Sequence, residues 1–370
     1  MKYYLIAGER SGDLHGANLI KALKQQDSEA VIRCWGGDAM QRAGGELVVH
    51  YRDTAFMGFW EVLVNLRTIR RFLRQCQEDI LAFQPDALIL IDYAGFNLRI
   101  ARFAKQQRLQ VFYYISPKVW AWNQSRAKKI KAVVDHMFVI LPFEKAFYAQ
   151  YDYAVDYVGN PLLDAIRDFT TNINFSQDHQ LDKRPVVALL PGSREQEIKN
   201  MLELMLDVVP RFPECQFVVA AVDSVPFALY QAIESHPSVK VVMNQTYDLL
   251  SQAWAAVVTS GTATLETALF EVPQVVVYQT SWVSYKIARS LIKVPYISLV
   301  NLIAEKAVVP ELIQEDFNEE EVVEKLRLLT VESDMRKQQL QNYQELKEKL
   351  GDMNTSETVA RLIGSYSTKH

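Results

Sequence analysis

The chain alternates short apolar runs with longer segments in which apolar residues recur every three or four positions. The apolar runs are rich in β-branched and aromatic residues and have the length of β-strands. In the first half they are Tyr3–Ala7, Val31–Trp35, Ala87–Ile91, Val111–Ile115 and Met137–Leu141. The segments between them, which include His15–Gln25, Val62–Phe83 and Asn97–Gln107, have helical periodicity. This alternation predicts a mainly parallel sheet with helices on both faces.

The alternation pauses over residues 164–184, a polar stretch that we interpret as an interdomain linker. It then restarts with five further runs: Val186–Leu190, Phe217–Val222, Val239–Met243, Ala255–Thr259 and Val275–Tyr278. The sequence therefore predicts an α/β protein of two Rossmann-like lobes, residues 1–165 and 166–339, with a cleft between them. In such sheets ligands bind beyond the carboxyl ends of the strands, so the residues that follow each strand are the candidates for function.

The C-terminal part of the chain has a different character. Residues Glu319–Leu329 and Asp334–Leu350 are strongly charged helical patterns, and Gly351 followed by Asn354 marks a helix end and a new start. We expect these helices to pack on the lobes, with residues from about 340 to 370 completing the first lobe. A contact between two copies of the chain is the alternative use of such helices, so a homodimer stays open.

The 370 residues carry 40 Lys and Arg against 44 Asp and Glu, a formal charge of −4, and a general nucleic-acid binder is usually more basic. The charge is unevenly distributed: residues 1–163 have 21 basic and 16 acidic side chains (+5), and residues 164–370 have 19 and 28 (−9). Three widely spaced cysteines indicate neither a disulfide framework nor a zinc site and favour a reduced, cytoplasmic setting. No run of about 18 uncharged apolar residues predicts a membrane-spanning helix.

The first predicted strand ends in a glycine-rich turn that opens a helix. Its glycines let the backbone approach a ligand closely. The candidate substrate-binding residues of this loop are Glu9, Ser11, Gly12 and Asp13. The spacing is not G-x-G-x-x-G, and no acidic residue ends the second strand, so an NAD site is poorly supported. Tight turning of the chain is the alternative explanation of the glycines.

Two helix starts in the second lobe are candidate anion sites. One follows Val186–Leu190 and the other follows Ala255–Thr259. Backbone N–H groups and the helix dipole favour phosphate at such positions, and Arg194 adds a guanidinium fork suited to phosphate oxygens. The candidate donor-binding residues are Gly192, Ser193, Glu197, Ser260, Gly261, Thr262 and Glu266, the last placed to accept hydrogen bonds from ribose hydroxyls. Two such sites indicate a nucleotide diphosphate, and simple helix capping is the alternative.

Asp92 directly follows the apolar run Ala87–Ile91 in the first lobe. Partial shielding from water would raise the pKa of its carboxyl group and suit it to act as a general base. The alternative is that Asp92 or Asn97 caps the following helix. After the next strand, Trp120 and Trp122 either offer flat surfaces to sugar rings and acyl chains or belong to the core.

One predicted helix of the first lobe carries a basic face. The side chains that share it are Arg67, Arg70, Arg71 and Arg74, and the segment before them contains Met57, Phe59 and Trp60. Such a helix fits an anionic membrane surface or a phosphorylated lipid, and a solvated face of an ordinary core helix is the alternative. The six histidines lack metal-ligand spacing, so no metal ligand is assigned.

These motifs together resemble the lipid-A-disaccharide synthase family, inverting glycosyltransferases (family 19) of the two-lobed GT-B type. The most specific blocks are the early Gly-Glu-x-Ser-Gly-Asp motif and Ser116-Pro117-Lys118-Val119-Trp120-Ala121-Trp122. The resemblance covers nearly the whole chain. Its other blocks are Met57 to Arg71, Ile91-Asp92 with Phe96-Asn97, Leu141–Glu144, Val158–Pro161, Leu190–Arg194 and Ser260–Ala263.

The resemblance implies UDP-2,3-diacylglucosamine as donor and 2,3-diacylglucosamine 1-phosphate (lipid X) as acceptor. The products would be a β-1,6-linked disaccharide 1-phosphate and UDP, made without cofactor or metal by a cytoplasmic enzyme peripherally associated with the inner membrane. Asp92 matches the proposed family base, Arg194 the arginine near the donor diphosphate, and Asn301 a polar position near the donor. The chain departs from the family at Gly95, where an aspartate is usual, and at Glu305, where a glycine is usual.

Other functions would share part of this pattern. A UDP-N-acetylglucosamine transferase of peptidoglycan synthesis, or a UDP-N-acetylglucosamine epimerase, would share the second lobe, but neither accounts for the arginine-rich helix. A non-catalytic membrane-binding module would bind anionic vesicles but not UDP. An NAD oxidoreductase is the least supported class, because the dinucleotide fingerprint is missing.

Overall fold

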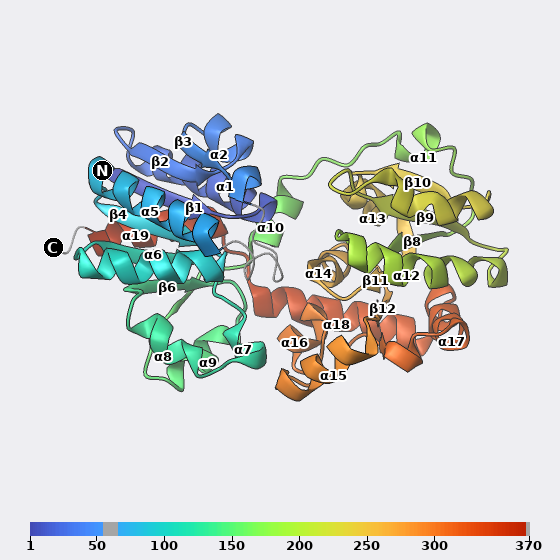
Figure 1. The fold of residues 1–370 in the computed structure, drawn as a ribbon. Helices are drawn as coiled ribbons and strands as arrows, with labels where there is room; N and C mark the ends of the chain where they lie inside the picture. The colour runs from blue at the N-terminus through green and yellow to red at the C-terminus, as the bar shows by residue number, and fades with distance from the viewer. Residues whose placement is uncertain (55–65, 368–370) are drawn as a thin grey trace. The chain divides into compact units, whose positions relative to one another are not determined.

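The computed structural model describes residues 1–54 and 66–367, which form two compact units. The first unit comprises Met1–Asp164 and Asp352–His370, and the second comprises Ala165–Gly351. Each unit is built on a parallel sheet with helices on both faces (Figure 1). The predicted α/β class with two Rossmann-like lobes is therefore confirmed.

The sheet of the first unit has seven parallel strands in the order β3-β2-β1-β4-β5-β6-β7. The strands are β1 (Lys2–Ala7), β2 (Val31–Gly36), β3 (Glu46–His50), β4 (Ala87–Ile91), β5 (Gln110–Tyr114), β6 (His136–Val139) and β7 (Asp156–Tyr157). The described helices are α1 (Arg10–Gln26), α2 (Asp38–Arg42), α3 (Tyr51–Thr54), α5 (Leu66–Phe83), α6 (Ala94–Gln106), α7 (Val119–Trp122), α8 (Arg126–Lys131), α9 (Glu144–Ala149), α10 (Pro161–Arg167), which crosses the boundary between the units, and α19 (Thr355–Ser367).

The sheet of the second unit has six parallel strands in the order β10-β9-β8-β11-β12-β13. The strands are β8 (Val186–Leu190), β9 (Gln216–Ala221), β10 (Lys240–Met243), β11 (Ala253–Thr259), β12 (Gln274–Tyr278) and β13 (Glu311–Ile313). The helices are α11 (Phe175–Asp178), α12 (Glu195–Asp207), α13 (Thr246–Gln252), α14 (Thr262–Leu269), α15 (Trp282–Leu291), α16 (Leu299–Ala304), α17 (Glu319–Thr330) and α18 (Asp334–Leu350), with short 3-10 turns at Val209–Arg211, Phe227–Ser235 and Gln314–Asp316.

Alternate residues of the central strands pack against different helical layers, as the two-residue period of a strand requires. In β8, Val187 and Leu189 join the cluster that contains Ile198 of α12. Their neighbours on the strand, such as Ala188, join a second cluster with Leu249 of α13. A strand buried on both faces reads as a continuous apolar run, which is why the sequence identified the central strands but not the short edge strands β3, β7 and β13.

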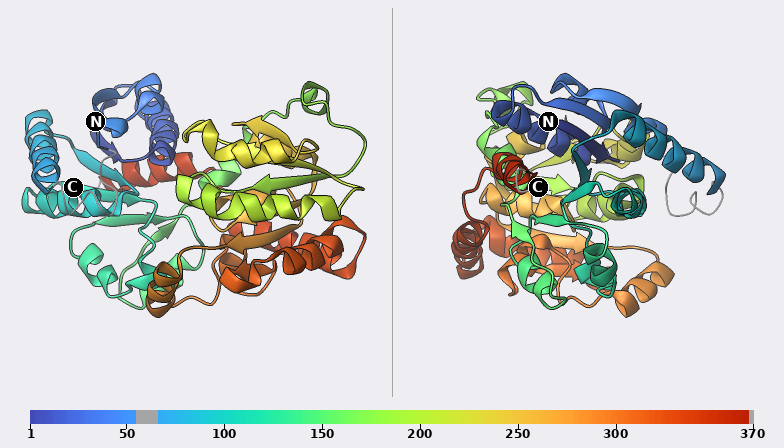
Figure 2. Two further views of the ribbon diagram at one scale, coloured as in Figure 1. Left: turned by 45° about the vertical axis from the view of Figure 1, so that its right-hand side comes forward. Right: turned by 90° about the vertical axis from the view of Figure 1, so that its left-hand side faces the viewer.

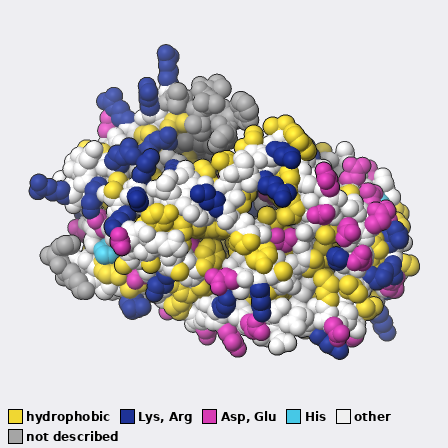
Figure 3. Space-filling view, turned by 90° about the horizontal axis from the view of Figure 1, so that it is seen from below, with side chains coloured by type: hydrophobic (Ala, Val, Ile, Leu, Met, Phe, Trp, Pro, Cys, Tyr) yellow, Lys and Arg dark blue, Asp and Glu magenta, His cyan; other side chains and the backbone are white. Residues whose placement is uncertain are grey.

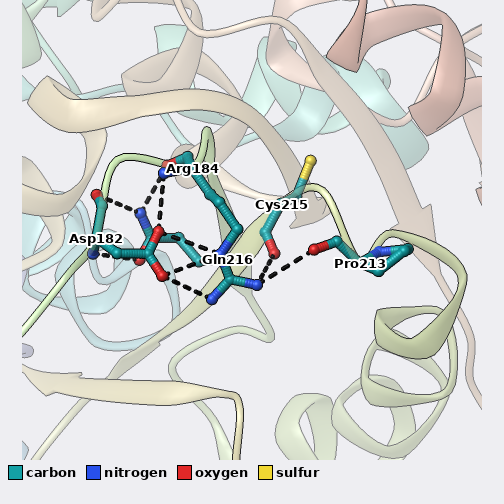
Figure 4. A network of polar contacts seen from close by, with 5 residues as sticks. All are labelled: Asp182, Arg184, Pro213, Cys215 and Gln216. Atoms are coloured by element: carbon teal, nitrogen blue, oxygen red, sulfur yellow. Dashed lines mark hydrogen bonds and ion pairs between the residues drawn. The ribbon is translucent and has the colours of Figure 1, made fainter.

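The structure corrects the predicted linker. Phe175 is fully buried in the second unit, in the same cluster as β8. A polar network then ties residues 182–184 to the start of β9 (Figure 4). In it the Arg184 guanidinium donates to the carbonyl oxygens of Pro213 (3.2 Å) and Cys215 (3.1 Å), and the Gln216 amide bonds the backbone of residues 182 and 184. Residues 175–184 are therefore part of the second unit, because buried contacts outweigh the polar composition of the segment.

The chain returns to the first unit later than residue 340. Helix α18 belongs to the second unit, where the Tyr343 hydroxyl lies in a buried network with Gln274 at the start of β12. Only α19 completes the first unit, beside α1 (Figure 2), with Val359 and Ile363 in its core. The backbone N–H of Thr355 donates to Asp164 at 2.9 Å, which anchors the returning segment.

Candidate active site

The candidate loops of the sequence lie at equivalent places in the two sheets. In each unit the strand order reverses beside the first strand, between β1 and β4 in one sheet and between β8 and β11 in the other. The motif segments that follow these four strands are Gly8–Asp13, Asp92–Asn97, Pro191–Arg194 and Ser260–Thr262, and the last residues of the first, second and fourth already lie in the first turns of α1, α6 and α14. The carboxyl edge at such a reversal is where open α/β sheets bind ligands. Each unit therefore places two motif loops at its expected binding position.

The backbone at Asp92 is strained and strongly held. Asp92 and Tyr93 have φ of 45° and 49°, a left-handed conformation that costs a non-glycine residue about 1–3 kcal/mol. The Asn97 amide donates to the carbonyl oxygens of Ile91 (3.2 Å) and Asp92 (2.8 Å), and the Tyr113 hydroxyl donates to the same Asp92 oxygen. Helix α6 begins after Tyr93 without any side-chain cap. The alternative explanation, in which Asp92 or Asn97 caps this helix, is therefore wrong.

The Asp92 carboxyl group keeps an exposed surface although its surroundings disfavour its charge. Partial desolvation raises its pKa above the ordinary aspartate value, and the negative charge of Glu9 adds to this effect. Lys118 and the backbone N–H of Tyr93 act in the opposite direction. A carboxylate with a raised pKa is a stronger base, so this group combines access to a ligand with enhanced proton affinity.

The glycine-rich loop after β1 owes much of its composition to packing. A Cβ atom on Gly8 would lie 2.2 Å from the ring of Tyr93, so only glycine leaves room for that ring. Asp13 is buried and accepts hydrogen bonds from the backbone N–H groups of Gly37 (2.8 Å) and Met40 (3.0 Å), which anchors the start of α2. Ser11, like Glu9, keeps an exposed side chain, whereas Gly12 is buried.

The start of α12 is organised around Glu197. Its carboxylate accepts hydrogen bonds from the backbone N–H groups of Ser193 (3.0 Å) and Arg194 (3.3 Å), and from Nη1 of the Arg194 guanidinium (3.0 Å). Gly192 has φ of 109°, and a Cβ atom there would lie 2.5 Å from a Glu197 oxygen. Ser193 does not cap the helix. Glu197 is thus bonded to the loop itself, while the Arg194 side chain stays largely exposed.

The start of α14 is open. Gly261 precedes the helix without a side-chain cap, and a Cβ atom there would meet nothing within 4 Å. Thr262 is exposed, whereas the Ser260 hydroxyl donates to the carbonyl oxygen of Ile297 at 2.9 Å. One turn into the helix, Glu266 accepts a hydrogen bond from the Tyr247 hydroxyl at 2.9 Å, and desolvation raises the pKa of the Glu266 carboxyl group.

Asn301 lies in the interior of the second unit with its amide fully bonded. Its nitrogen donates to the carbonyl oxygen of Val309 and to Glu311, both at 2.9 Å, and its oxygen accepts from the N–H groups of Val308 (2.8 Å) and Val309 (2.9 Å). Glu311 also accepts from Ser298 and from the N–H of Ile297, whose carbonyl accepts from Ser260. The sequence reading missed Glu311, although an acidic residue within the apolar run 307–313 was a signal.

A second missed residue is Glu144, which is almost fully buried in the first unit. It accepts hydrogen bonds from the indole N–H of Trp120 (3.2 Å) and the backbone N–H of Leu141 (3.0 Å). Burial raises the pKa of Glu144 to about 7. Trp120 is therefore a core residue that fixes the loop after β5. Trp122 is exposed, and the Arg126 guanidinium lies 5.8 Å from the centre of its ring.

The basic face predicted for α5 is present. Its members Arg67, Arg70, Arg71 and Arg74 are all exposed, on the side of the helix opposite the buried Ile69, Cys76 and Ile80. Lys and Arg side chains project there at the upper left of Figure 3. Met57, Phe59 and Trp60 lie outside the described residues. Within residues 1–54 and 66–367, no helix has the length and apolar character needed to span a bilayer, and no group of three or more His, Cys, Asp and Glu side chains is arranged to hold a metal ion.

Comparison with known proteins shows the family and the fold of the chain. A family model for lipid-A-disaccharide synthetase matches residues 3–363. The lipid-A-disaccharide synthase of Syntrophus aciditrophicus is 39% identical over 364 residues, covering 96% of this chain and 95% of that protein. Among solved structures, a UDP-GlcNAc 2-epimerase from Neisseria meningitidis (13% identity, TM-score 0.64, 100% of both chains) and the calicheamicin glycosyltransferase CalG4 (15%, 0.63, 99% of this chain and 98% of that one) share the fold. The chain belongs to the lipid-A-disaccharide synthase family and is a GT-B glycosyltransferase of lipid A biosynthesis.

Proposed function

We propose that this glycosyltransferase transfers the sugar of UDP-2,3-diacylglucosamine to the 6-hydroxyl of 2,3-diacylglucosamine 1-phosphate. The products are the β-1,6-linked lipid A disaccharide 1-phosphate and UDP. The single observation that carries the proposal is family membership together with the position of four motif segments, those after β1, β4, β8 and β11, which lie where each sheet reverses its strand order. Both substrates carry phosphate and acyl chains, which suits cationic and apolar surfaces.

The donor is proposed to bind the second unit. The open N-terminus of α14 at Gly261 and Thr262 offers unblocked backbone N–H groups to the diphosphate, and the exposed Arg194 adds a guanidinium. Glu266 is placed one helical turn further on, where its carboxylate can accept hydrogen bonds from the ribose hydroxyls. These groups also stabilise the negative charge that develops on UDP as it leaves.

The acceptor is proposed to bind the first unit beside Asp92. The Asp92 carboxylate takes the proton of the 6-hydroxyl while that oxygen attacks the anomeric carbon of the donor. The bond between the anomeric carbon and the UDP oxygen breaks from the opposite side, so the configuration inverts and the electron pair leaves with UDP. The raised pKa of Asp92 supports this role, because it increases the proton affinity of the base. Glu9, at the N-cap of α1, and Ser11, in its first turn, are exposed and available to the acceptor.

Peripheral binding to the cytoplasmic face of the inner membrane is part of the proposal. Acylated substrates reside in or near a bilayer, and the four exposed arginines of α5 form a cationic stripe that anionic headgroups would attract. An exposed Lys or Arg near such a surface contributes about 1 kcal/mol of binding free energy.

The proposal is tested by measuring UDP release from the two acylated glucosamine substrates in mixed-detergent micelles. Asp92→Asn should lower turnover by about 10²–10⁴ while UDP still binds, because only proton transfer is lost. Asp86→Asn is the matched control, since Asp86 lies just before the opposite end of β4 and accepts from the backbone N–H of Lys2. Turnover of UDP-N-acetylglucosamine without the acylated substrates would instead identify an epimerase or a transferase of soluble sugars, and failure to bind UDP would indicate a membrane-binding module.

A further inference from the structure

Helix α15 of the second unit presents large apolar side chains to solvent. None of its ten residues is buried. Trp282, Val283, Ile287 and Leu291 have between 49% and 65% of their surface exposed. Isolated exposed apolar residues are ordinary, but four on one helix of ten residues are a concentration typical of an interaction surface.

The helical period sorts these side chains into two adjoining stripes. Val283, Ile287 and Leu291 are four residues apart and share one stripe. Lys286, Trp282 and Arg289 form the neighbouring stripe. Viewed down the helix axis, Trp282 lies between the two cations. The opposite side carries Tyr285 and Ala288, which are partly buried against the unit. The outward face is thus apolar along one edge and basic along the other, a pattern typical of helices that lie in a membrane surface.

The charge around α15 contrasts with the rest of the second unit. Between Glu271 and Glu305 the chain has three basic residues, Lys286, Arg289 and Lys293, and no acidic one. Within the described part of the chain none of the three forms an ion pair. Instead, the Lys286 ammonium lies 5.2 Å from the ring of Trp282, and the Arg289 guanidinium lies near the ring of Tyr285 and donates to its hydroxyl. These cations are therefore available to an anionic partner.

We propose that α15 lies flat on an anionic phospholipid bilayer, with its apolar stripe among the acyl chains near the headgroups and its cations on the phosphates. A lipid surface satisfies both stripes at once, and Trp282 is a residue type favoured at the interface. A second copy of the chain fits less well, because facing copies of α15 would bring cations together without acidic partners. Figure 3 shows apolar, basic and acidic side chains intermixed on the second unit. The inference deepens the proposed membrane contact, on which it rests, by naming a surface distinct from α5.

Co-sedimentation of the full chain with vesicles tests the proposal. Vesicles of phosphatidylglycerol mixed with phosphatidylethanolamine are compared with vesicles of phosphatidylcholine. One variant, Ile287→Ser with Leu291→Ser, removes the apolar stripe, and another, Lys286→Glu with Arg289→Glu, reverses the charge. The matched controls are Ile173→Ser with Phe227→Ser, which removes exposed apolar residues elsewhere in the second unit, and Lys183→Glu with Lys337→Glu, which reverses exposed charges there.

We expect each α15 variant to bind anionic vesicles at least about tenfold more weakly than the unchanged chain, and the charge variant to lose its preference for phosphatidylglycerol. The controls should change binding less than about twofold. UDP affinity measured without vesicles reports folding and should stay unchanged in all variants. Wild-type vesicle binding by both α15 variants would overturn the proposal, as would a concentration-dependent dimer that Ile287→Ser with Leu291→Ser converts to a monomer. If Arg70→Glu with Arg71→Glu weakens binding while the α15 variants do not, the membrane contact of α5 stands and only that of α15 fails.

Discussion

The Arg194 guanidinium donates to the Glu197 carboxylate across 3.0 Å, from Nη1 to Oε1. The other carboxylate oxygen accepts from the backbone N–H groups of Ser193 and Arg194 at the start of α12. These are the donors that a diphosphate would use at this helix start. Glu197 therefore occupies the anion position with a negative charge of its own, and a phosphate must displace it or share Arg194 with it.

This arrangement predicts that Glu197→Gln strengthens UDP binding. The neutral amide competes less well for Arg194 and no longer repels the diphosphate, so we expect the dissociation constant of UDP to fall roughly threefold to tenfold. Isothermal titration calorimetry measures it, with Arg194→Ala expected to weaken binding. Glu195→Gln is the control, because Glu195 is on the same helix and, among the described residues, its carboxylate pairs with Lys199 at 3.5 Å. Weaker binding by Glu197→Gln would mean that the carboxylate positions Arg194 or contacts the donor itself.

The surroundings of Asp92 predict a tunable acid limb in the pH profile of kcat/KM. The base must be deprotonated to act, so activity falls as the pH drops through its raised pKa. Glu9→Gln removes a negative neighbour, lowers the pKa of Asp92 and should move the acid limb to lower pH. Lys118→Met removes the opposing positive charge and should move the limb to higher pH. Glu29→Gln, beyond the other end of α1, should leave it unchanged.

The two shifts must have opposite signs for the assignment to hold. If neither substitution moves the acid limb, the group that titrates there is not Asp92. If both move it in the same direction, the change comes from a rearranged loop and not from the charges. Comparing kcat with kcat/KM then separates protonation of the free enzyme from that of the substrate complex.

Sequence reasoning located the loops of the site but not the bonding inside them. The apolar runs identify β1, β4, β8 and β11, and parallel topology then brings their carboxyl ends to one edge of each sheet. The role of Asp13 as an anchor for α2 depends on Gly37 and Met40, which are 24 and 27 residues away and which no local pattern connects to it. No local pattern indicates the role of Asn301 either, because its partners Val308 and Val309 belong to a loop that surrounds it only in the folded unit.

The exposed apolar face of α15 shows a second property that the sequence does not predict. Its helical period is readable in the sequence, yet periodicity alone does not reveal whether an apolar stripe faces the core or solvent. The basic face of α5 was predictable because charged side chains are almost never buried without partners. Glu144 follows the same rule, because three backbone and indole N–H donors compensate its buried carboxylate, but no local sequence pattern indicates those partners.

Burial of Glu144 predicts a pH-dependent stability of the first unit. The pKa of its carboxyl is about 7 in the folded chain, against the ordinary glutamate value of 4.5. Between these values the folded chain keeps the proton while the unfolded chain releases it, so stability falls as the pH rises from 4.5 to 7. The loss is complete above pH 7 and amounts to about 3 kcal/mol. Hydrogen exchange of the β5 amides at several pH values measures this slope, after correction for intrinsic exchange rates.

Glu144→Gln should flatten that slope because the amide does not titrate. The variant is expected to be less stable than the unchanged chain at low pH, since its NH₂ group faces donors that the carboxyl oxygens accept from. Glu46→Gln, an exposed residue of β3 paired with Arg33, should retain the original slope. An unchanged slope in Glu144→Gln would assign the pH dependence to another group.

The bonding of Asn301 predicts that its removal acts on the structure of the second unit before it acts on the donor. Asn301→Ala leaves the buried N–H groups of Val308 and Val309 without their acceptor, each at a cost of about 1–3 kcal/mol. Hydrogen exchange of these two amides should therefore accelerate strongly. Asn318→Ala is the matched control, because the Asn318 side chain caps α17 and donates to the carbonyl oxygen of Glu315, away from Val308 and Val309, and loss of the cap should cost about 1 kcal/mol.

UDP affinity then separates a structural role of Asn301 from a direct contact. A structural role predicts that UDP binding weakens only as far as the loop is loosened, and that the N–H groups of Val308 and Val309 lose protection in the same variant. The family resemblance places this residue near the donor, where a direct contact would require one of its four hydrogen bonds to be given up. If Asn301→Ala keeps full amide protection but binds UDP tenfold more weakly, the amide contacts the donor and the network is rearranged on binding.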